Sequence, residues 1–335
     1  MAYIYKKTKN GKSYYYLRIS KRVKGRVFTK DVAYLGNTIP KVISELENLP
    51  AKYAAEIRKS YKKIKHFIDS NTYLEKVKKL KLKDDDYLER DVLDNVEAIN
   101  LHFKTIFLKL NEKTIMNVYK DFLVEFAYNT TSIEGNTITL QEADKLLREN
   151  LTPKEKSLRE IYDLKNTQET FFNLLENKPK FNHELILEMH KGLMKNIDKR
   201  TGYRTHDIRV FKSHFESSPA KYVKADMDLL LHWYKKHEKK LHPLVLNSLF
   251  HQKFEKIHPF SDGNGRTGRM LFNYLLILQD YPPFIIQRKN RSEYLKNLNK
   301  ADKSYPNGIE IKHYADLVNY VSNEFIESYW NTFNV

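Results

Sequence analysis

The sequence has 335 residues, 41% hydrophobic and 30% charged, which is the composition of an ordinary soluble protein with one to three domains. Because it contains no cysteine, disulfides, thiolate zinc sites and cysteine nucleophiles are excluded, which suits a cytoplasmic protein. The net charge of +17 fits nucleic acid, acidic lipid or an acidic partner, or a lysine-rich composition alone.

The apolar segments give no sign of membrane insertion. The first residues lack an apolar core of signal-peptide length, and the longest apolar run, residues 270–278, contains Asn273 and is too short to span a bilayer. We expect a buried helix there and no membrane partner.

Residues 1–38 predict a small three-stranded antiparallel sheet. Residues 14–19 are aromatic and β-branched, Asn10-Gly11 predicts a type I′ turn, and Lys24-Gly25 predicts the next turn. About half the net charge lies here, against Asp31 alone, on Lys6, Lys7, Lys9, Lys12, Arg18, Lys21, Arg22, Lys24, Arg26 and Lys30. Such a sheet binds nucleic acid or a protein target, or its lysines guard its edges against aggregation.

Helical periodicity dominates the following segments. Residues 39–110 predict a helical connector, with a helix start at Thr72 because Thr72 and Glu75 have capping-box spacing. A longer helix is expected from Asn111 to Ile133, followed by a capping box at 139–142. Pro153 predicts the start of another helix, and His190 further on is expected to be a packed core histidine.

Residues 258–269 concentrate chemistry in one loop between two apolar helical segments. Gly263 and Gly265 permit sharp turns that bring backbone N–H groups to an anion, and Asn264 between them tolerates the left-handed conformation. The following helix is expected to begin near Gly265, so that its N-terminus faces the same anion. The loop therefore predicts a phosphate site.

Four further side chains define the chemistry of this loop. Arg266 and Arg269 share a helix face and offer two forks for phosphate oxygens. Asp262 suits an anion site only if Mg²⁺ lies between its carboxylate and the phosphates. His258 has the unperturbed pKa of a general base near neutral pH.

The pattern His-Pro-Phe-Ser-Asp-Gly-Asn-Gly-Arg-Thr-Gly-Arg at 258–269 resembles the signature of the Fic family at every fixed position. The resemblance implies a mainly α fold, a helical bundle with a β-hairpin flap, and transfer of AMP from ATP, with Mg²⁺, to a hydroxyl of a target protein. A kinase-like branch carries lysine where this chain has Gly265, so AMP transfer is favoured over phosphorylation.

Glu134 is unusual because it lies in the last turn of its expected helix, where the helix dipole disfavours a carboxylate and a cation is expected to hold it. Thr130, Glu134 and Gly135 resemble the inhibitory motif of the family. That resemblance implies pairing of Glu134 with Arg269, which removes the arginine from the γ-phosphate of the nucleotide.

Residues 202–211 contain the candidate flap. Gly202-Tyr203-Arg204 resembles a family segment, and the alternation over Ile208, Arg209, Val210 and Phe211 predicts a short strand beside the active site. A strand edge there captures an extended target segment by main-chain hydrogen bonds.

The expected domains are a basic β unit (1–38), a helical connector (39–110) and a Fic-type catalytic domain (111–335) with the inhibitory helix. Three functions stay open. They are an autoinhibited AMP transferase, a hydrolase in which Glu134 positions water to remove AMP from a modified protein, and a nucleic-acid-binding protein with a vestigial nucleotide pocket. A homodimer also stays open, because no interface stripe is distinctive.

Overall fold

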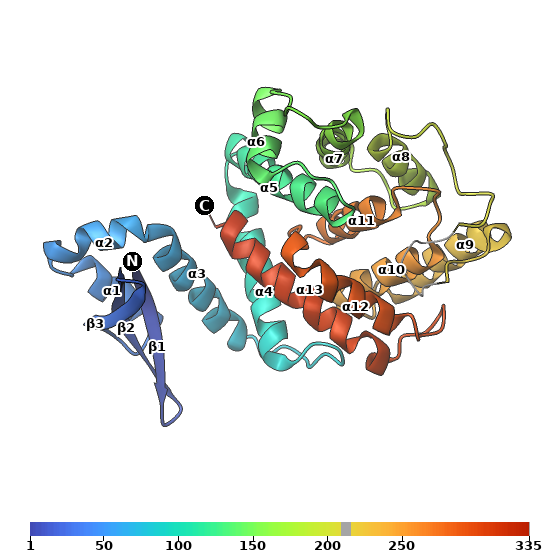
Figure 1. The fold of residues 1–335 in the computed structure, drawn as a ribbon. Helices are drawn as coiled ribbons and strands as arrows, with labels where there is room; N and C mark the ends of the chain where they lie inside the picture. The colour runs from blue at the N-terminus through green and yellow to red at the C-terminus, as the bar shows by residue number, and fades with distance from the viewer. Residues whose placement is uncertain (209–215, 335) are drawn as a thin grey trace.

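The computed structural model describes residues 1–208 and 216–334, and over these ranges the protein is mainly helical. A small antiparallel sheet at the N-terminus lies to one side of a larger helical body (Figure 1). These features confirm the predicted fold class. Within the flap strand predicted from Ile208 to Phe211, only Ile208 is described, and it lies in no strand.

No helix in the described parts of the chain combines the length and the apolar character that crossing a membrane requires.

The N-terminal sheet has the strand order β1-β2-β3, with β1 (Ala2–Lys9), β2 (Lys12–Val23) and β3 (Arg26–Gly36). Asn10 and Gly11 have φ values of +50° and +74°, and Lys24 and Gly25 have +47° and +80°. Positive φ at both central residues is what a type I′ turn requires, so both predicted turns are present. Strand β2 is longer than predicted because its ends pair with β1 and β3 up to these turns.

One face of the sheet is covered by helices α1 (Ile39–Glu47) and α3 (Tyr61–Lys78), which short α2 (Ala54–Lys59) connects. The apolar residues between them form a cluster of their own: Ala2, Ile4, Tyr15, Leu17, Leu35, Ile39, Val42 and Ile64. The helix start predicted at Thr72 is wrong, because Thr72 lies inside α3. The helix continues there since Tyr73 and Val77 are buried in the larger cluster of the helical body.

The helical body contains one large hydrophobic core and a smaller separate cluster around Ala143 and Leu146. Its helices are α4 (Arg90–Thr105), α5 (Glu112–Ile133), α6 (Leu140–Glu149), α7 (Leu158–Asn177), α8 (His183–Leu193), α9 (Val223–His237), α10 (Pro243–Ile257), α11 (Asn264–Leu278), α12 (Arg291–Ala301) and α13 (Ile311–Thr332). Helices α10 and α11 pack against each other, and α5, α8 and α13 contact this pair. The loop that joins α10 to α11 therefore rests on a rigid support.

Helix boundaries follow the capping residues. Asn111 caps α5, and Thr139 with Glu142 forms the expected capping box of α6. The helix start predicted at Pro153 is wrong, because α7 begins later, at a capping box formed by Ser157 and Glu160. Glu155 has φ of +57°, which no helix interior accommodates.

Candidate functional site

The loop between α10 and α11 is fixed by left-handed residues at both of its ends. His258 ends α10 with φ of +53° and donates its backbone N–H to the Phe254 carbonyl at 3.0 Å. Gly263 has φ of +79°, and α11 begins at the next residue, Asn264. The Asn264 side chain closes the loop, because its oxygen accepts from the Phe260 N–H and its amide donates to the Phe260 carbonyl, each at 2.8 Å.

Two conformational expectations for this loop are wrong. Asn264 is not left-handed but is the first residue of α11, where its side chain is needed to close the loop. Gly265 is helical, so it supplies no turn. A Cβ at position 265 would collide with the Glu134 carboxylate, and glycine is therefore what allows α5 to bring that carboxylate to the start of α11.

His258 is oriented as a proton acceptor. Its Nδ1 lies 3.2 Å from the Glu255 carbonyl, and because a carbonyl only accepts, Nδ1 carries the hydrogen. The lone pair of the neutral ring is therefore on Nε2. Burial lowers the pKa of His258 below its ordinary value, which keeps the ring neutral near pH 7.

Arg204 holds the backbone at His258 and is a site residue to which the sequence assigned no role. Its Nε donates to the His258 carbonyl at 2.8 Å, and its backbone N–H donates to the Pro259 carbonyl at 2.9 Å. The guanidinium also donates to the carbonyls of Ile257 and Ser218. Arg204 thus occupies the C-terminal end of α10, where a cation is favoured, and fixes the start of the loop.

Glu134 and Thr130 on the last turns of α5 contact Arg269. The Arg269 Nη2 lies 2.6 Å from a Glu134 carboxylate oxygen, and its Nε donates to the Thr130 hydroxyl at 2.8 Å. Arg269 is buried, whereas the Glu134 side chain is 44% exposed. Desolvation raises the pKa of Glu134, but the charge of Arg269 outweighs it, so the pKa lies below its ordinary value. The inhibitory role of this pair stays a prediction.

The end of α5 has the geometry expected from its sequence. Gly135 follows the helix with φ of +107°, which only glycine adopts readily. Arg291 at the start of α12 donates its Nε to the Ile133 carbonyl at 2.7 Å. Arg269 and Arg291 therefore supply the positive charge that a carboxylate in the last turn of a helix requires.

Asp262 and Arg266 are tied to α7 by two charged residues that sequence reasoning missed. Arg159 contacts the Asp262 carboxylate and Asp163 contacts the Arg266 guanidinium, while Arg266 and Asp262 are themselves 3.2 Å apart. Arg159 and Asp163 are four residues apart and share a face of α7. Nothing in their spacing distinguishes them from an ordinary solvated pair, so only the fold reveals this contact.

His190 is the packed histidine that the sequence predicts, and it also supports the loop. Its ring stacks on Phe260, with centroids 3.7 Å apart and planes at 5°. Its Nε2 lies 2.9 Å from the Asp262 carbonyl and donates to it. Behind the loop, a Cβ at Gly263 would lie 2.6 Å from the sulfur of Met194, so α8 packs closely against the turn.

Comparison with known proteins gives this loop its family. Residues 180–276, from the start of α8 to near the end of α11, match the Fic/DOC family. The chain carries a Fic domain. This domain contains His258, Asp262, Arg266 and Arg269, whereas Glu134 on α5 lies outside the matched residues.

Curated relatives extend the similarity beyond the matched residues. The chain is 32% identical over 196 residues to a protein adenylyltransferase Fic of Drosophila ananassae, covering 55% of this chain and 38% of that relative. It is 29% identical over 225 residues to the protein of that name in Aedes aegypti, covering 64% and 42%. The chain therefore spans about two fifths of the length of these relatives.

Solved structures share the fold around the Fic domain. A Fic domain containing signaling protein from Bacteroides thetaiotaomicron superposes with a TM-score of 0.63 at 26% identity, covering 70% of this chain and 94% of that one. Fic-1 from C. elegans superposes with a TM-score of 0.61 at 23% identity, covering 72% and 71%.

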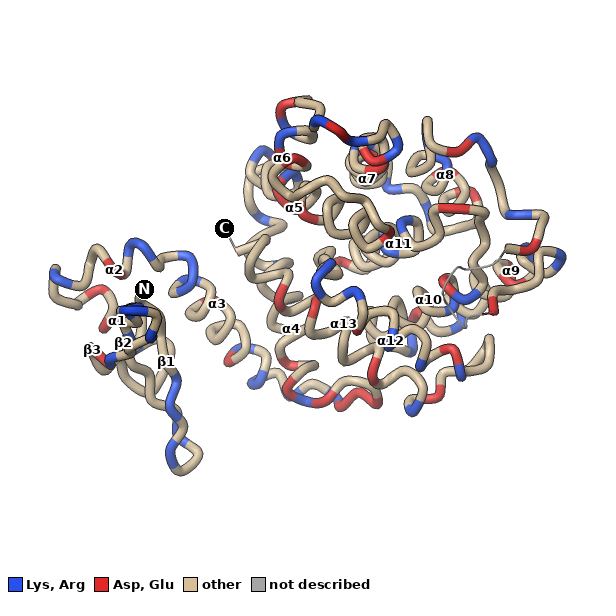
Figure 2. Tube along the Cα trace, viewed as in Figure 1, with Lys and Arg blue, Asp and Glu red and all other residues tan. Residues whose placement is uncertain are grey.

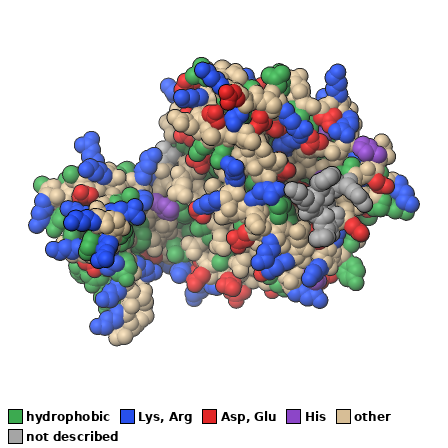
Figure 3. All heavy atoms as spheres, in the orientation of Figure 1, with side chains coloured by type: hydrophobic (Ala, Val, Ile, Leu, Met, Phe, Trp, Pro, Cys, Tyr) green, Lys and Arg blue, Asp and Glu red, His purple; other side chains and the backbone are tan. Residues whose placement is uncertain are grey.

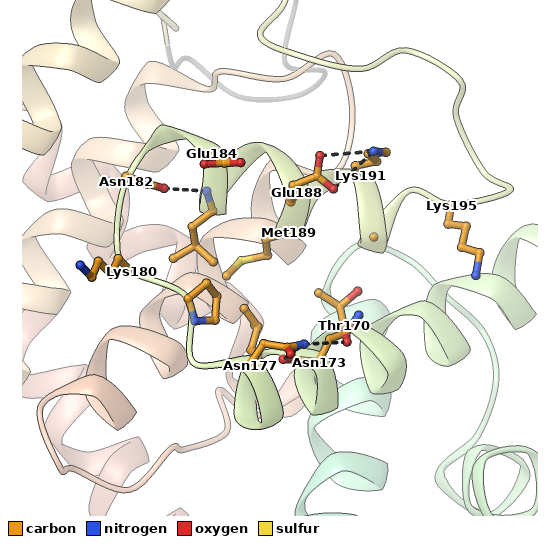
Figure 4. Close-up of a pocket in the computed structure, with 14 residues that line it drawn as sticks. Thr170, Asn173, Asn177, Lys180, Asn182, Glu184, Glu188, Met189, Lys191 and Lys195 are labelled. Atoms are coloured by element: carbon orange, nitrogen blue, oxygen red, sulfur yellow. Dashed lines mark hydrogen bonds and ion pairs between the residues drawn. The ribbon is translucent and has the colours of Figure 1, made fainter.

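A cavity of about 710 Å³ opens between α7 and α8 (Figure 4). Thr170, Asn173 and Asn177 line it from α7, and Glu188 and Met189 line it from α8. None of its lining residues belongs to the loop at 258–269. The cavity is therefore separate from the candidate site of the Fic domain.

Asp262 is the residue of the Fic domain that fits a magnesium ion. Desolvation raises its pKa, but Arg266 and Arg159 together hold the pKa below its ordinary value, so the carboxylate is ionised. Among the described residues, no three His, Asp or Glu side chains lie close enough together to hold a metal. A single carboxylate suits Mg²⁺, which takes its other ligands from phosphates and water.

Proposed function

We propose that the Fic domain transfers AMP from ATP to the hydroxyl of a Ser, Thr or Tyr side chain on a target protein, and that Glu134 restrains this activity. The observation that carries the proposal is the orientation of His258. Its Nδ1 is engaged by a main-chain carbonyl, and its proton-accepting Nε2 belongs to the same loop as Asp262 and the start of α11.

The phosphates would be held by the start of α11. The N–H groups of Gly263, Asn264 and Gly265 lie at the N-terminal end of the helix, where backbone donors and the helix dipole favour an anion. Arg266 and Arg269 would neutralise the remaining phosphate charge. Asp262 would hold Mg²⁺, which would supply positive charge to offset the charge on the departing pyrophosphate.

The transfer itself is a displacement at the α-phosphorus. The target hydroxyl gives its proton to Nε2 of His258 while its oxygen forms a bond to phosphorus. The bond from that phosphorus to the bridging oxygen breaks, and pyrophosphate leaves with the electron pair. The protein holds these groups in line, and this positioning supplies much of the rate enhancement. The flap residues 208–211 are proposed to present the target segment.

The restraint follows from the contacts of Arg269. While its guanidinium donates to Glu134 and Thr130, it has fewer donors for the γ-phosphate of ATP. A hydrogen bond to a charged group contributes about 1.5–3 kcal/mol, so removing Glu134 is expected to raise AMP transfer about tenfold or more.

The test is mass spectrometry of the full chain after incubation with ATP and Mg²⁺. We expect Glu134→Gly to add one AMP to itself or to added target protein faster than wild type, and His258→Ala in the same background to abolish the addition. Glu188→Gln, which changes an exposed glutamate that pairs with Lys191, is the control and should behave as wild type. Equal labelling of wild type and Glu134→Gly would contradict the restraint, and labelling without His258 would contradict the mechanism.

A second function is supported by the exposure of Glu134. Because its side chain is 44% exposed, its carboxylate can reach water and could direct a water molecule at an AMP-modified protein. Incubation of a modified target with wild type and Glu134→Ala separates the two functions. Faster removal of AMP by wild type indicates the hydrolase, whereas a gain of transfer on mutation indicates the restrained transferase.

A further inference from the structure

The N-terminal sheet has an outer face that the helices leave uncovered. Side chains alternate along a strand, so the face opposite the buried Ile4 and Leu17 carries Tyr5, Tyr16 and Arg18. In Figure 1, α1 and α3 lie along one side of the sheet, and no helix covers the other side. The AMP transfer proposed for the Fic domain uses no residue of this outer face.

The charge of the sheet is almost entirely positive. Its one acidic residue, Asp31, is already paired with Arg18, whose Nε lies 2.5 Å from the carboxylate. The other nine cations are exposed, and within the described residues none of them forms an ion pair: Lys6, Lys7, Lys9, Lys12, Lys21, Arg22, Lys24, Arg26 and Lys30. Figure 2 marks Lys and Arg along these strands, and Figure 3 shows their side chains gathered over the same part of the molecule.

These cations cluster at the two hairpins. Four surround the β1–β2 turn, where Lys9 and Lys12 lie directly opposite each other, and five surround the β2–β3 turn. Like charges placed opposite each other destabilise a sheet, and a bound polyanion removes that cost.

The distance between the two hairpins matches a dimension of double-stranded DNA. Strand β2 has 12 residues, which at about 3.3 Å per residue gives about 40 Å between the two turns. One helical turn of B-form DNA is about 34–36 Å, so each basic hairpin can meet phosphates one turn apart.

The aromatic residues of the outer face favour a duplex over a single strand. Tyr5, Tyr16 and Tyr34 form a row across the three strands. The Arg18 guanidinium lies 3.5 Å from the centre of the Tyr5 ring, and the Tyr16 and Tyr34 rings are 5.3 Å apart. Because these rings already contact neighbouring side chains, they are poor platforms for stacking unpaired bases.

We propose that the outer face and basic hairpins of the N-terminal sheet bind double-stranded DNA, chiefly through its phosphates. The β2–β3 hairpin also exposes Val27, which lies opposite Arg22 on the outer face, is 60% accessible and can contact thymine methyl groups in the groove. This binding is independent of the nucleotide chemistry proposed above. It would place the Fic domain beside targets that are themselves bound to DNA.

The test measures binding of the full-length protein to a fluorescent 30-base-pair duplex over a range of salt concentrations. The first variant replaces four cations of the β2–β3 hairpin by glutamine: Lys21, Arg22, Lys24 and Arg26. The control variant removes the same charge from an exposed basic cluster at the end of α9: Lys235, Lys236, Lys239 and Lys240. Circular dichroism confirms that both variants fold.

We expect the hairpin variant to reduce the slope of log affinity against log salt by about 2–4, because each phosphate contact contributes about 0.9 to that slope. The control variant should retain the slope of wild type. Equal losses in both variants would show a general charge effect and overturn the proposal, as would tighter binding of single-stranded DNA or equal competition by polyglutamate. Both variants in the Glu134→Gly background should keep the rate of AMP transfer, which separates this proposal from the proposed function.

Discussion

Both the backbone and the ring of His258 are held in place by neighbouring groups. Its left-handed backbone, the Arg204 guanidinium on its carbonyl and the Glu255 carbonyl on Nδ1 together define where Nε2 points. A histidine whose Nδ1 donates to a main-chain carbonyl needs no carboxylate partner to fix its tautomer. The pH dependence of transfer should therefore follow the titration of this one ring.

The first prediction concerns that pH dependence. Burial lowers the pKa of His258 below its ordinary value of 6.5, so the neutral ring persists at pH values where an exposed histidine is charged. With ATP and Mg²⁺ in excess, the rate of AMP transfer by Glu134→Gly should fall to half its maximum at a pH below 6.5, because the pKa of His258 lies below its ordinary value. Initial rates between pH 5 and 8 test this, and a midpoint above 6.5 would contradict it.

At the residue scale, the sequence predicts which residues form the site better than it predicts why each residue type is needed there. The loop residues at 258–269 follow from their motif, and the helix dipole predicts a cation beside Glu134. The resemblance to the family's inhibitory motif is what names Arg269 as that cation, and the structure places the two side chains in contact. The reason given for Gly265 was wrong, because the room it leaves for Glu134 depends on a residue 131 positions away. Arg159 and Asp163 were missed for the same cause, since their partners lie on α11 and its preceding loop.

Helix α7 begins where side-chain hydrogen bonds are available rather than where proline first permits a helix. The Glu160 carboxylate accepts from the backbone N–H and hydroxyl of Ser157 and also from both groups of Thr137. Glu160 thus caps α7 and holds the segment after α5. The start at Pro153 failed as a prediction because local propensity carries no information on this distant partner.

The second prediction concerns this cap. Hydrogen bonds from Thr137 and Ser157 lower the pKa of Glu160 from 4.5 to about 2. A lowered pKa means that the stabilisation is complete above pH 4.5 and is lost as the pH falls toward 2. Glu160→Gln should therefore reduce the free energy of unfolding at pH 7 by about 0.5–2 kcal/mol, and less at acid pH. Denaturant unfolding at both pH values measures this difference.

Glu142→Gln provides the matched control for that measurement. Glu142 forms the same capping box with Thr139 at the start of α6, but its hydrogen bonds stay within that box. Its replacement should cost less than that of Glu160. Equal costs would show that the contact with Thr137 adds nothing to stability.

The sequence predicted helices and strands correctly wherever the hydrophobic periodicity and the turn or capping residues indicated the same element. The Asn10-Gly11 turn and the Lys24-Gly25 turn connect the three strands of the sheet, and Asn111 caps the start of α5 as predicted. Helix α3 was misread, because its continuation past Thr72 depends on burial of Tyr73 and Val77 against α4 and the rest of the body. Tertiary burial therefore overrides a local capping signal.

At the scale of the whole molecule, the site couples elements from both halves of the helical body. Helix α5 supplies Glu134, α7 supplies Arg159 and Asp163, and the loop before α11 supplies the proposed phosphate site. Binding of a nucleotide should therefore be linked to overall stability, because a ligand that binds only the folded state stabilises it.

The third prediction uses this linkage. In wild type, Arg269 must leave its contact with Glu134 before it can fully contact a nucleotide. In Glu134→Gly this contact is absent, so binding breaks no ion pair. ATP with Mg²⁺ should therefore raise the Tm of Glu134→Gly further than that of wild type, by about 2 °C for a tenfold gain in affinity. Thermal unfolding with His258→Ala in both backgrounds prevents turnover, and equal increases in Tm would contradict the prediction.

Helix α5 is also a structural member of the core, since Phe122 and Phe126, about three and two turns before Glu134, are fully or almost fully buried. A segment anchored in this way cannot detach as a removable plug while the protein stays folded. On the proposed function, a signal that releases Arg269 must therefore act at short range, by rotating the Glu134 side chain or by competing for its oxygens. Release of this kind would take the time of a side-chain rotation rather than that of an unfolding event.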